Sequence, residues 1–112
     1  MSSKYLKKKD NLWFLENGKE VCIGITKEAQ EELGEITFIN LPTVGQTIKQ
    51  GDALFEVEAE KAVSEFASPV SGTISSLNEK IAEDIHVLNT ADELDAWVLS
   101  LKDVDTEAFS KL

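Results

Sequence analysis

The sequence predicts a mainly β protein, a flattened β-barrel or sandwich hybrid, with a short helix near residues 27–33 and another at the C-terminus. Short apolar runs recur at regular spacing along the 112 residues. Glycine, proline and Asn-Gly turn signals separate these runs, and helical patterns occur only at the margins. A chain of this length suits one compact domain with its own hydrophobic core.

The first half of the chain is expected to alternate strands and turns around one helix. Asn17-Gly18 signals a two-residue hairpin turn, because both residue types tolerate positive φ. Thr26 is expected to cap a helix at Lys27–Leu33, which Gly34 ends. The expected strands of this half are Leu12–Leu15, Glu20–Ile25, Ile36–Leu41 and Ala53–Glu58.

The second half continues the same pattern and ends in a helix. Strands are expected at Ala62–Ala67, Thr73–Leu77 and Ala96–Leu101. Residues 78–94 are interrupted by polar residues, and we expect one helical turn within this stretch. The stretch from Asp103 to the C-terminus predicts a short helix capped by Asp105 or Thr106.

The charge is unevenly distributed along the chain. All eleven basic residues are lysines, and four of them lie in the first nine residues, which hold no acid. We expect residues 1–10 to form a flexible lysine-rich tail and residues 11–112 to form a single domain. Residues 10–112 carry all 21 acidic residues, which disfavours nucleic acid and membrane partners. This acidic stretch suits partners with basic docking surfaces, unless the charge serves solubility alone.

Several other residues predict no chemistry of their own. No apolar run is long enough to span a membrane and no apolar signal segment stands at the start, so a cytoplasmic location is expected. Cys22 lies in a predicted strand and is expected to act as a small buried hydrophobe. His86, the one histidine, has no clustered ligands and is expected to be structural or exposed. We find no nucleophile–base arrangement, which predicts a protein that is not an enzyme.

The most informative segment is a predicted hairpin whose tip holds Lys61. A lysine at such a tip projects into solvent on a flexible stem, where an enzyme can reach it. The small side chains of Ala59 and Ala62 keep the approach open, and Glu58 and Glu60 add negative charge. Taken alone, an exposed lysine more often serves solubility than modification.

The hairpin runs into a turn, Ser68-Pro69-Val70-Ser71-Gly72. This combination resembles the lipoyl-attachment region of the glycine cleavage H-protein family, in which a Glu-Ser-Val-Lys-Ala motif precedes a Ser-Pro-Val-Ser-Gly turn. Glu58, Lys61 and Ala62 match the first motif, and the turn matches the second at the same distance. The resemblance extends over about residues 11–101 and includes Val21–Thr26, Ala29-Gln30, Leu33-Gly34, Leu41-Pro42 and Val44-Gly45.

The resemblance implies a fold of the lipoyl/biotinyl-carrier type and a non-catalytic protein. It implies lipoate covalently attached to Lys61 as a swinging arm, with Glu58, Glu60 and Ala62 as the recognition hairpin around it. A lipoate–protein ligase or lipoyltransferase would be the modifying partner. Biotin-carrier domains usually place methionines beside the lysine, whereas Glu60 and Ala62 flank it here.

Three departures from the family bear on the role of the arm. Asn11-Leu12-Trp13 replaces a His-Glu-Trp triplet, and Glu60 precedes the lysine where the family has valine. A Pro-Tyr-Gly segment, which the family carries near the arm, is absent from residues 90–96. These departures resemble an H-like subgroup associated with a lipoate ligase, a macrodomain protein and a sirtuin.

The resemblance to this subgroup implies an arm that serves lipoyl relay or redox-linked regulation, with the carrier as a target of ADP-ribosylation. Macrodomain and sirtuin proteins would then be partners. The first alternative is a true H protein that shuttles the aminomethyl group between glycine decarboxylase and aminomethyltransferase. The second is an unmodified interaction module that has kept only the scaffold.

Overall fold

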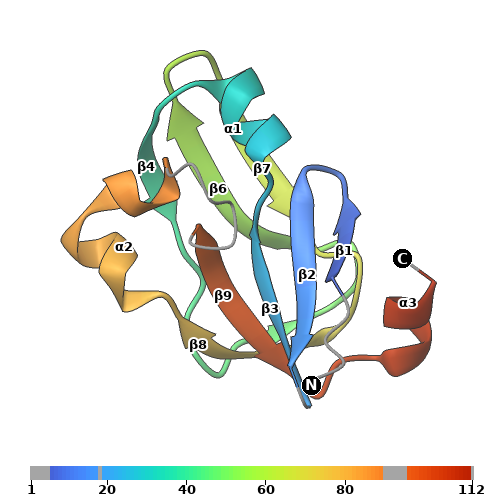
Figure 1. The fold of residues 1–112 in the computed structure, drawn as a ribbon. Coiled ribbons are helices and arrows are strands. Elements are labelled where there is room, and N and C mark those ends of the chain that lie inside the picture. The colour runs from blue at the N-terminus through green and yellow to red at the C-terminus, as the bar shows by residue number, and fades with distance from the viewer. Residues whose placement is uncertain (1–5, 18, 90–95, 112) are drawn as a thin grey trace.

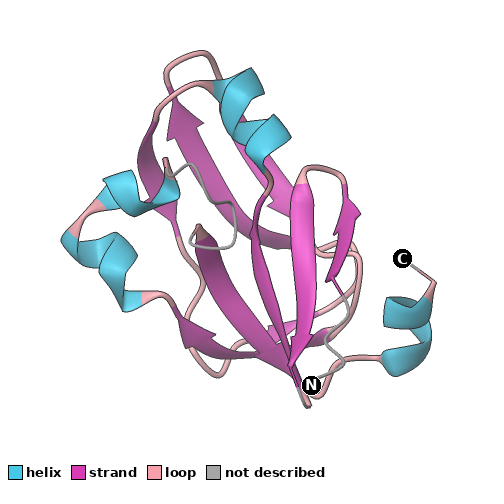
Figure 2. Cartoon of the chain, in the orientation of Figure 1, coloured by secondary structure: helices cyan, strands magenta, loops and turns pink. Residues whose placement is uncertain are grey.

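The computed structural model describes residues 6–17, 19–89 and 96–111, which form two antiparallel sheets and several short helices (Figure 1). A curled six-stranded sheet has the order β1-β2-β3-β9-β8-β5, and a three-stranded sheet has the order β4-β6-β7. Figure 2 shows the helices at the periphery of these strands. The prediction of a mainly β, flattened barrel or sandwich is confirmed.

The strands and helices have the following bounds. The strands are β1 (Leu6–Lys9), β2 (Leu12–Asn17), β3 (Glu20–Ile25), β4 (Ile36–Asn40), β5 (Thr47–Ile48), β6 (Ala53–Ala59), β7 (Val63–Ala67), β8 (Gly72–Leu77) and β9 (Trp97–Lys102). The helices are α1 (Lys27–Leu33), α2 (Glu79–Glu83), the 3₁₀ helix η1 (Ile85–Leu88) and α3 (Thr106–Ser110).

The core lies between the two sheets, as the alternation of apolar residues requires. The largest fully buried side chains of the protein are Leu12, Trp13, Phe14, Ile23, Ile25, Ile36, Ile48, Leu54, Ile74, Leu88, Leu99 and Leu101, and all of them except Trp13 belong to this core. Phe55 and Phe66 face each other across β6 and β7, with ring centroids 5.0 Å apart. None of the described helices is long and apolar enough to cross a membrane.

Strand β1 departs from the expectation of a flexible tail over residues 1–10. Leu6–Lys9 pairs with β2, and the last pair, between Lys9 and Leu12, encloses a two-residue turn. Asp10 and Asn11 both have positive φ there, which Asp and Asn tolerate better than most residues. An edge strand rich in lysine also resists pairing with other chains, so the lysines fit this position. Residues 1–5 lie outside the described part of the chain.

The turn between β2 and β3 lies where it was expected. Asn17 pairs with Glu20, so the two strands form a hairpin. Gly18, the second residue of the expected Asn-Gly turn, lies outside the described residues.

The helix ends follow the expected capping chemistry. The Thr26 side chain accepts a hydrogen bond from the Ala29 amide at the start of α1, and Gly34 ends this helix with φ of 78°. Asp105 caps α3 and accepts from the amides of Glu107 and Ala108. Residues 78–89 hold α2 and η1, where one helical turn was expected.

Strands β2 and β3 meet at a contact that only glycine allows. Gly24 lies opposite Trp13 in the ladder, and a Cβ on Gly24 would lie 2.3 Å from the Cε2 and Cζ2 atoms of the indole. Trp13 is only 1% exposed, so its ring has no free space to move into. The indole therefore packs on bare backbone.

We expect Gly24→Ala to lower the free energy of unfolding by about 1–3 kcal/mol, because the added methyl group overpacks the core. Trp13→Leu removes the indole atoms that the methyl group would meet. In the Trp13→Leu background, Gly24→Ala should therefore cost much less. Urea unfolding of the four proteins in this double-mutant cycle measures the coupling. Additive effects of the two substitutions would show that the Trp13 ring does not limit the space for a side chain at position 24.

Candidate functional site

Lys61 stands at the tip of the β6–β7 hairpin, as the sequence predicts. The Ala59 amide donates to the Ala62 carbonyl over 2.9 Å, which leaves Glu60 and Lys61 as the two tip residues. The side chains of Glu60, Lys61 and Ala62 are all exposed. The ε-amino group is therefore accessible to a modifying enzyme.

The tip is held by the connection between α1 and β4 (Figure 1). The Glu60 amide donates to the Glu35 carbonyl over 2.8 Å, and the Lys61 amide donates to the Leu33 carbonyl over 2.9 Å. We call these two hydrogen bonds the tip clamp. They give the backbone under Lys61 a fixed position relative to α1.

Gly34 makes the tip clamp possible. It lies between the two acceptor residues with φ of 78°, in the region that favours glycine. A Cβ at this position would lie 2.7 Å from Glu60 Oε1 and 3.1 Å from Glu60 Cβ. The sequence identified Gly34 as the end of a helix, but nothing in the sequence pointed to its contact with the hairpin tip.

The Lys61 side chain lies over the last turn of α1. Its Nζ donates to the Glu31 carbonyl over 3.3 Å. Carbonyl groups at a helix C-terminus attract a cation, and this exposed contact is weak enough to release the amine. Acylation of Nζ would remove the positive charge that favours the contact.

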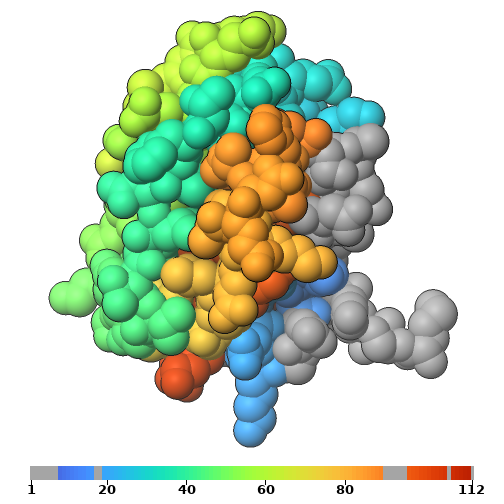
Figure 3. Space-filling model, turned by 90° about the vertical axis from the view of Figure 1, so that its left-hand side faces the viewer, coloured from blue at the N-terminus to red at the C-terminus, as the bar shows by residue number. Residues whose placement is uncertain are grey.

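A shallow cavity of about 250 Å³ opens beside Lys61, and its lining residues are Lys27, Gln30, Glu31, Gly34, Glu35 and Asn89. Asn89 also lines this cavity, although it is more than 50 residues away in the sequence from the other lining residues. Its side chain accepts from the Ile36 amide over 2.9 Å and donates to the Ile36 carbonyl over 3.1 Å, as a neighbouring strand would. Figure 3 shows the chain around η1 beside β4, with the β6–β7 tip at the upper end. A group attached to Lys61 could rest in this cavity.

Comparison with known proteins matches the chain to one family. The profile described as glycine cleavage H-protein matches residues 3–112. The chain belongs to this family. A glycine cleavage system H protein from Coprothermobacter proteolyticus is 43% identical over 103 residues, which cover 90% of this chain and 80% of the relative. One from Nitratidesulfovibrio vulgaris is 40% identical over 90 residues, which cover 80% of this chain and 71% of the relative.

A solved structure agrees with the sequence comparisons. The glycine cleavage system H protein from Mycobacterium marinum superimposes with a TM-score of 0.76 at 28% identity, over 95% of this chain and 94% of that chain. H proteins are non-catalytic carriers that hold lipoate covalently on a lysine. The chain is therefore an H-protein-like lipoyl carrier.

The replacement of the family's His-Glu pair by Asn11-Leu12 can be placed in the fold. Leu12, where the family has glutamate, is 1% exposed and packs in the core. The Asn11 carbonyl accepts from the Thr26 amide over 3.0 Å, which ties the β1–β2 turn to the start of α1. Residues 90–95, where the Pro-Tyr-Gly segment is missing, lie outside the described residues.

His86 is exposed and joins η1 to the α1–β4 connection. Its Nδ1 lies 2.9 Å from Asp84 Oδ1 and its Nε2 lies 3.5 Å from Glu35 Oε2. The hydrogen bond to Asp84 raises the pKa of His86, and the hydrogen bond from the His86 backbone amide lowers the pKa of Asp84. Within the described part of the chain, no group of three or more side chains is arranged to hold a metal ion. His86 links η1 to Glu35, a residue that lines the cavity.

Cys22 is half-buried rather than fully buried as expected. It lies on the opposite face of β3 from Val21 and Ile23, and a hydrogen bond links it to Ser100. Partial burial raises the pKa of its thiol. A raised thiol pKa disfavours the thiolate, which supports the expectation of an unreactive side chain.

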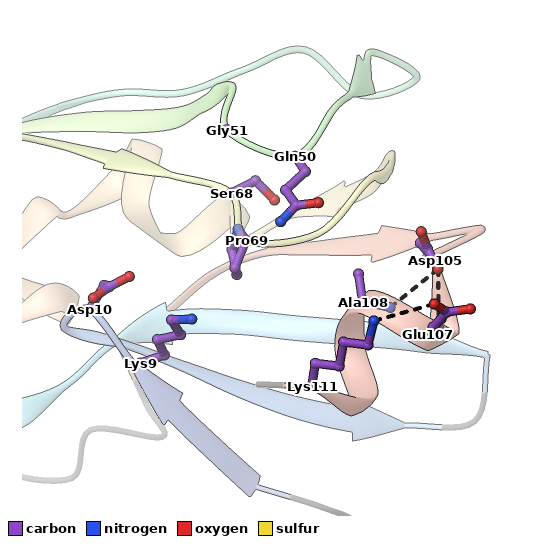
Figure 4. Close-up of a pocket in the computed structure, with 10 residues that line it drawn as sticks. All are labelled: Lys9, Asp10, Gln50, Gly51, Ser68, Pro69, Asp105, Glu107, Ala108 and Lys111. Atoms are coloured by element: carbon purple, nitrogen blue, oxygen red, sulfur yellow. Dashed lines mark hydrogen bonds and ion pairs between the residues drawn. The ribbon is translucent and has the colours of Figure 1, made fainter.

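A second cavity, of about 460 Å³, lies beyond the other end of the β6–β7 hairpin (Figure 4). Strand β6 spans the length of the hairpin from Ala53 to Ala59, so that end lies roughly 20 Å from the tip. Lys9 and Lys111 line it together with Asp105 and Glu107, and Lys111 Nζ lies 3.3 Å from Glu107 Oε1. The mixture of lysine and carboxylate side chains in this second cavity favours no class of ligand. The cavity is also too far from Lys61 to form part of the same site.

Proposed function

We propose that Lys61 is the lysine that carries the lipoyl group. The observation that carries this proposal is the tip clamp, which fixes the backbone of an exposed lysine beside a cavity. Glu58, Glu60 and Ala62 would form the recognition hairpin. The two glutamates occupy different positions in the hairpin. Glu58 pairs with Val63 within the sheet, whereas Glu60 lies at the tip.

The residues around Lys61 fit an acylated lysine. Ala59 and Ala62 leave the approach to Nζ open, and Gly34 lets α1 end without covering it. The lipoyl group supplies a dithiolane that opens to a dithiol and can accept a carbon adduct or two electrons. Gln30, Glu31 and Asn89 would line the resting place of the arm beside Lys61.

Lys61→Arg should abolish lipoylation and leave the fold intact, because the side chain is exposed and its one described hydrogen bond is to a carbonyl at the surface. Lys19 is the matched control, since it also lies in an exposed hairpin connection. Lys19→Arg should be lipoylated as fully as the wild type. Intact mass and peptide mapping after incubation with lipoate, ATP and a lipoate ligase measure both. Lipoate found on another lysine of the wild type would contradict the assignment.

For the role of the arm, we propose lipoyl relay or redox-linked regulation, with the carrier as a target of ADP-ribosylation in the cytoplasm. Macrodomain and sirtuin proteins would be partners beside the lipoate ligase. The support is the replacement of the His-Glu pair by Asn11-Leu12, with Leu12 buried in the core and unable to face the arm. The lack of Pro-Tyr-Gly in residues 90–96 adds to it.

The second candidate is a true H protein that shuttles the aminomethyl group between glycine decarboxylase and aminomethyltransferase. The match of the family profile to residues 3–112 favours it, as do relatives described as glycine cleavage system H proteins. The two candidates share Lys61 and the arm. They differ in how well the loaded arm is shielded from water.

We expect the fully lipoylated protein to support glycine cleavage at no more than about a tenth of the turnover of an authentic H protein, which is equivalent to an overall barrier roughly 1.4 kcal/mol higher. The reason is faster hydrolysis of the aminomethyl adduct, because the His-Glu pair and the Pro-Tyr-Gly segment, which lie where the family shields the loaded arm from water, are missing here. Reconstitution with the other glycine cleavage components measures this turnover. Turnover equal to that of the authentic protein would establish the second candidate instead.

A further inference from the structure

The sheet β4-β6-β7 presents one face to the core and one to solvent, which we call the outer face. Phe38, Glu58 and Val63 form one cross-strand row on it, because Glu58 pairs with both of the others. Phe38 is 53% exposed and Val63 is 64% exposed. This row is the last one before the hairpin tip that holds Lys61.

The next row of the outer face is acidic. Glu56 pairs with Asn40 on one side and with Glu65 on the other. Two carboxylates directly opposite each other in a ladder repel and destabilise the sheet. Among the described residues, no ion pair with a lysine offsets this repulsion.

This row also borders a hollow of about 290 Å³ at the end of the face away from the tip. Asn40, Glu56 and Glu65 line it together with Pro42 and Gln46. A cationic side chain entering the hollow would meet both carboxylates of the opposed pair. The face thus combines an exposed apolar row with an acidic hollow.

Neither feature of the outer face contributes to the stability of the free protein. A sheet face that served only solubility would place lysines opposite glutamates and keep phenylalanine and valine inside. Exposed apolar groups beside unpaired charge are typical of a surface that a partner covers. The complementary partner carries basic side chains around an apolar pocket.

The position of the outer face next to Lys61 selects the partner. The tip clamp holds the flank of the tip that faces α1, whereas Val63, two residues beyond Lys61, is exposed on the outer face. An enzyme that uses the loaded arm can bind farther from Lys61, because the lipoyl group lengthens the side chain. The enzyme that forms the amide must bring its own active site to Lys61, and the row of Phe38, Glu58 and Val63 is the part of the outer face nearest to the tip that holds this lysine.

We propose that the outer face is the docking surface of the enzyme that attaches lipoate to Lys61. The inference rests on the proposed function of Lys61. Basic side chains of that enzyme bind the opposed pair Glu56 and Glu65, and an apolar pocket takes up Phe38 and Val63.

The test is steady-state lipoylation of the unmodified full-length protein by a lipoate–protein ligase that modifies the wild type, with lipoate and ATP. Phe38→Ala and Val63→Ala should each raise the KM for the carrier by about fivefold to tenfold and leave kcat within about twofold. Val44→Ala is the apolar control, since Val44 is 54% exposed and lies outside this sheet. It should leave both constants unchanged.

Glu56→Lys separates docking from folding. It replaces the repulsion with Glu65 by an attraction, so the thermal midpoint should stay the same or rise. The KM should nevertheless rise about tenfold, and raised salt should weaken wild-type docking more than docking of the variant. Glu83→Lys on α2 makes the same change in net charge and should not affect KM.

The outcomes distinguish this proposal from the function on which it rests. If the wild type is not lipoylated on Lys61, the proposed function fails. If the wild type is lipoylated and the outer-face variants keep its KM, the docking proposal alone is overturned. Variants that load normally but exchange poorly with glycine decarboxylase or aminomethyltransferase would also overturn it, because the face would then serve a later partner.

Discussion

The arrangement around Lys61 depends on two backbone hydrogen bonds, from the amides of Glu60 and Lys61 to the carbonyls of Glu35 and Leu33. A two-residue tip at the end of a hairpin has few contacts of its own and would fray. Each of these hydrogen bonds contributes about 0.5–1.5 kcal/mol. Together they restrict the tip backbone and leave the lysine side chain exposed, so the arm would swing from a fixed base.

The tip clamp in turn depends on parts of the chain that are distant in sequence. Thr26 caps α1 and bonds to the Asn11 carbonyl, which positions the start of the helix against the β1–β2 turn. Asn89 binds both backbone groups of Ile36 and positions the start of β4. The connection that holds Lys61 is thereby fixed at both of its ends. This explains how a solvent-exposed residue can have a defined location in a small domain.

The sequence predicted those features that local chemistry determines. Alternating apolar residues predicted the strands, Thr26 and Gly34 predicted the ends of α1, and the motif around Lys61 predicted the tip. The lysine run at residues 7–9 concealed β1, because no apolar alternation marks this strand, although Asp10-Asn11 fits a tight hairpin turn. The tip clamp and the bridging role of Asn89 could not be predicted, because they join residues that are 25 to 53 positions apart in the sequence.

Amide hydrogen exchange at Glu60 and Lys61 tests the central claim most directly, because both side chains are exposed and only the tip clamp protects their amides. NMR-detected exchange of the unmodified protein should show both amides slowed by at least about tenfold relative to an unstructured peptide of the same sequence. Exchange of both amides at the unstructured rate would contradict the account. It would mean that the hairpin tip moves independently of α1 and that the sequence around Lys61, rather than a fixed position, distinguishes this lysine.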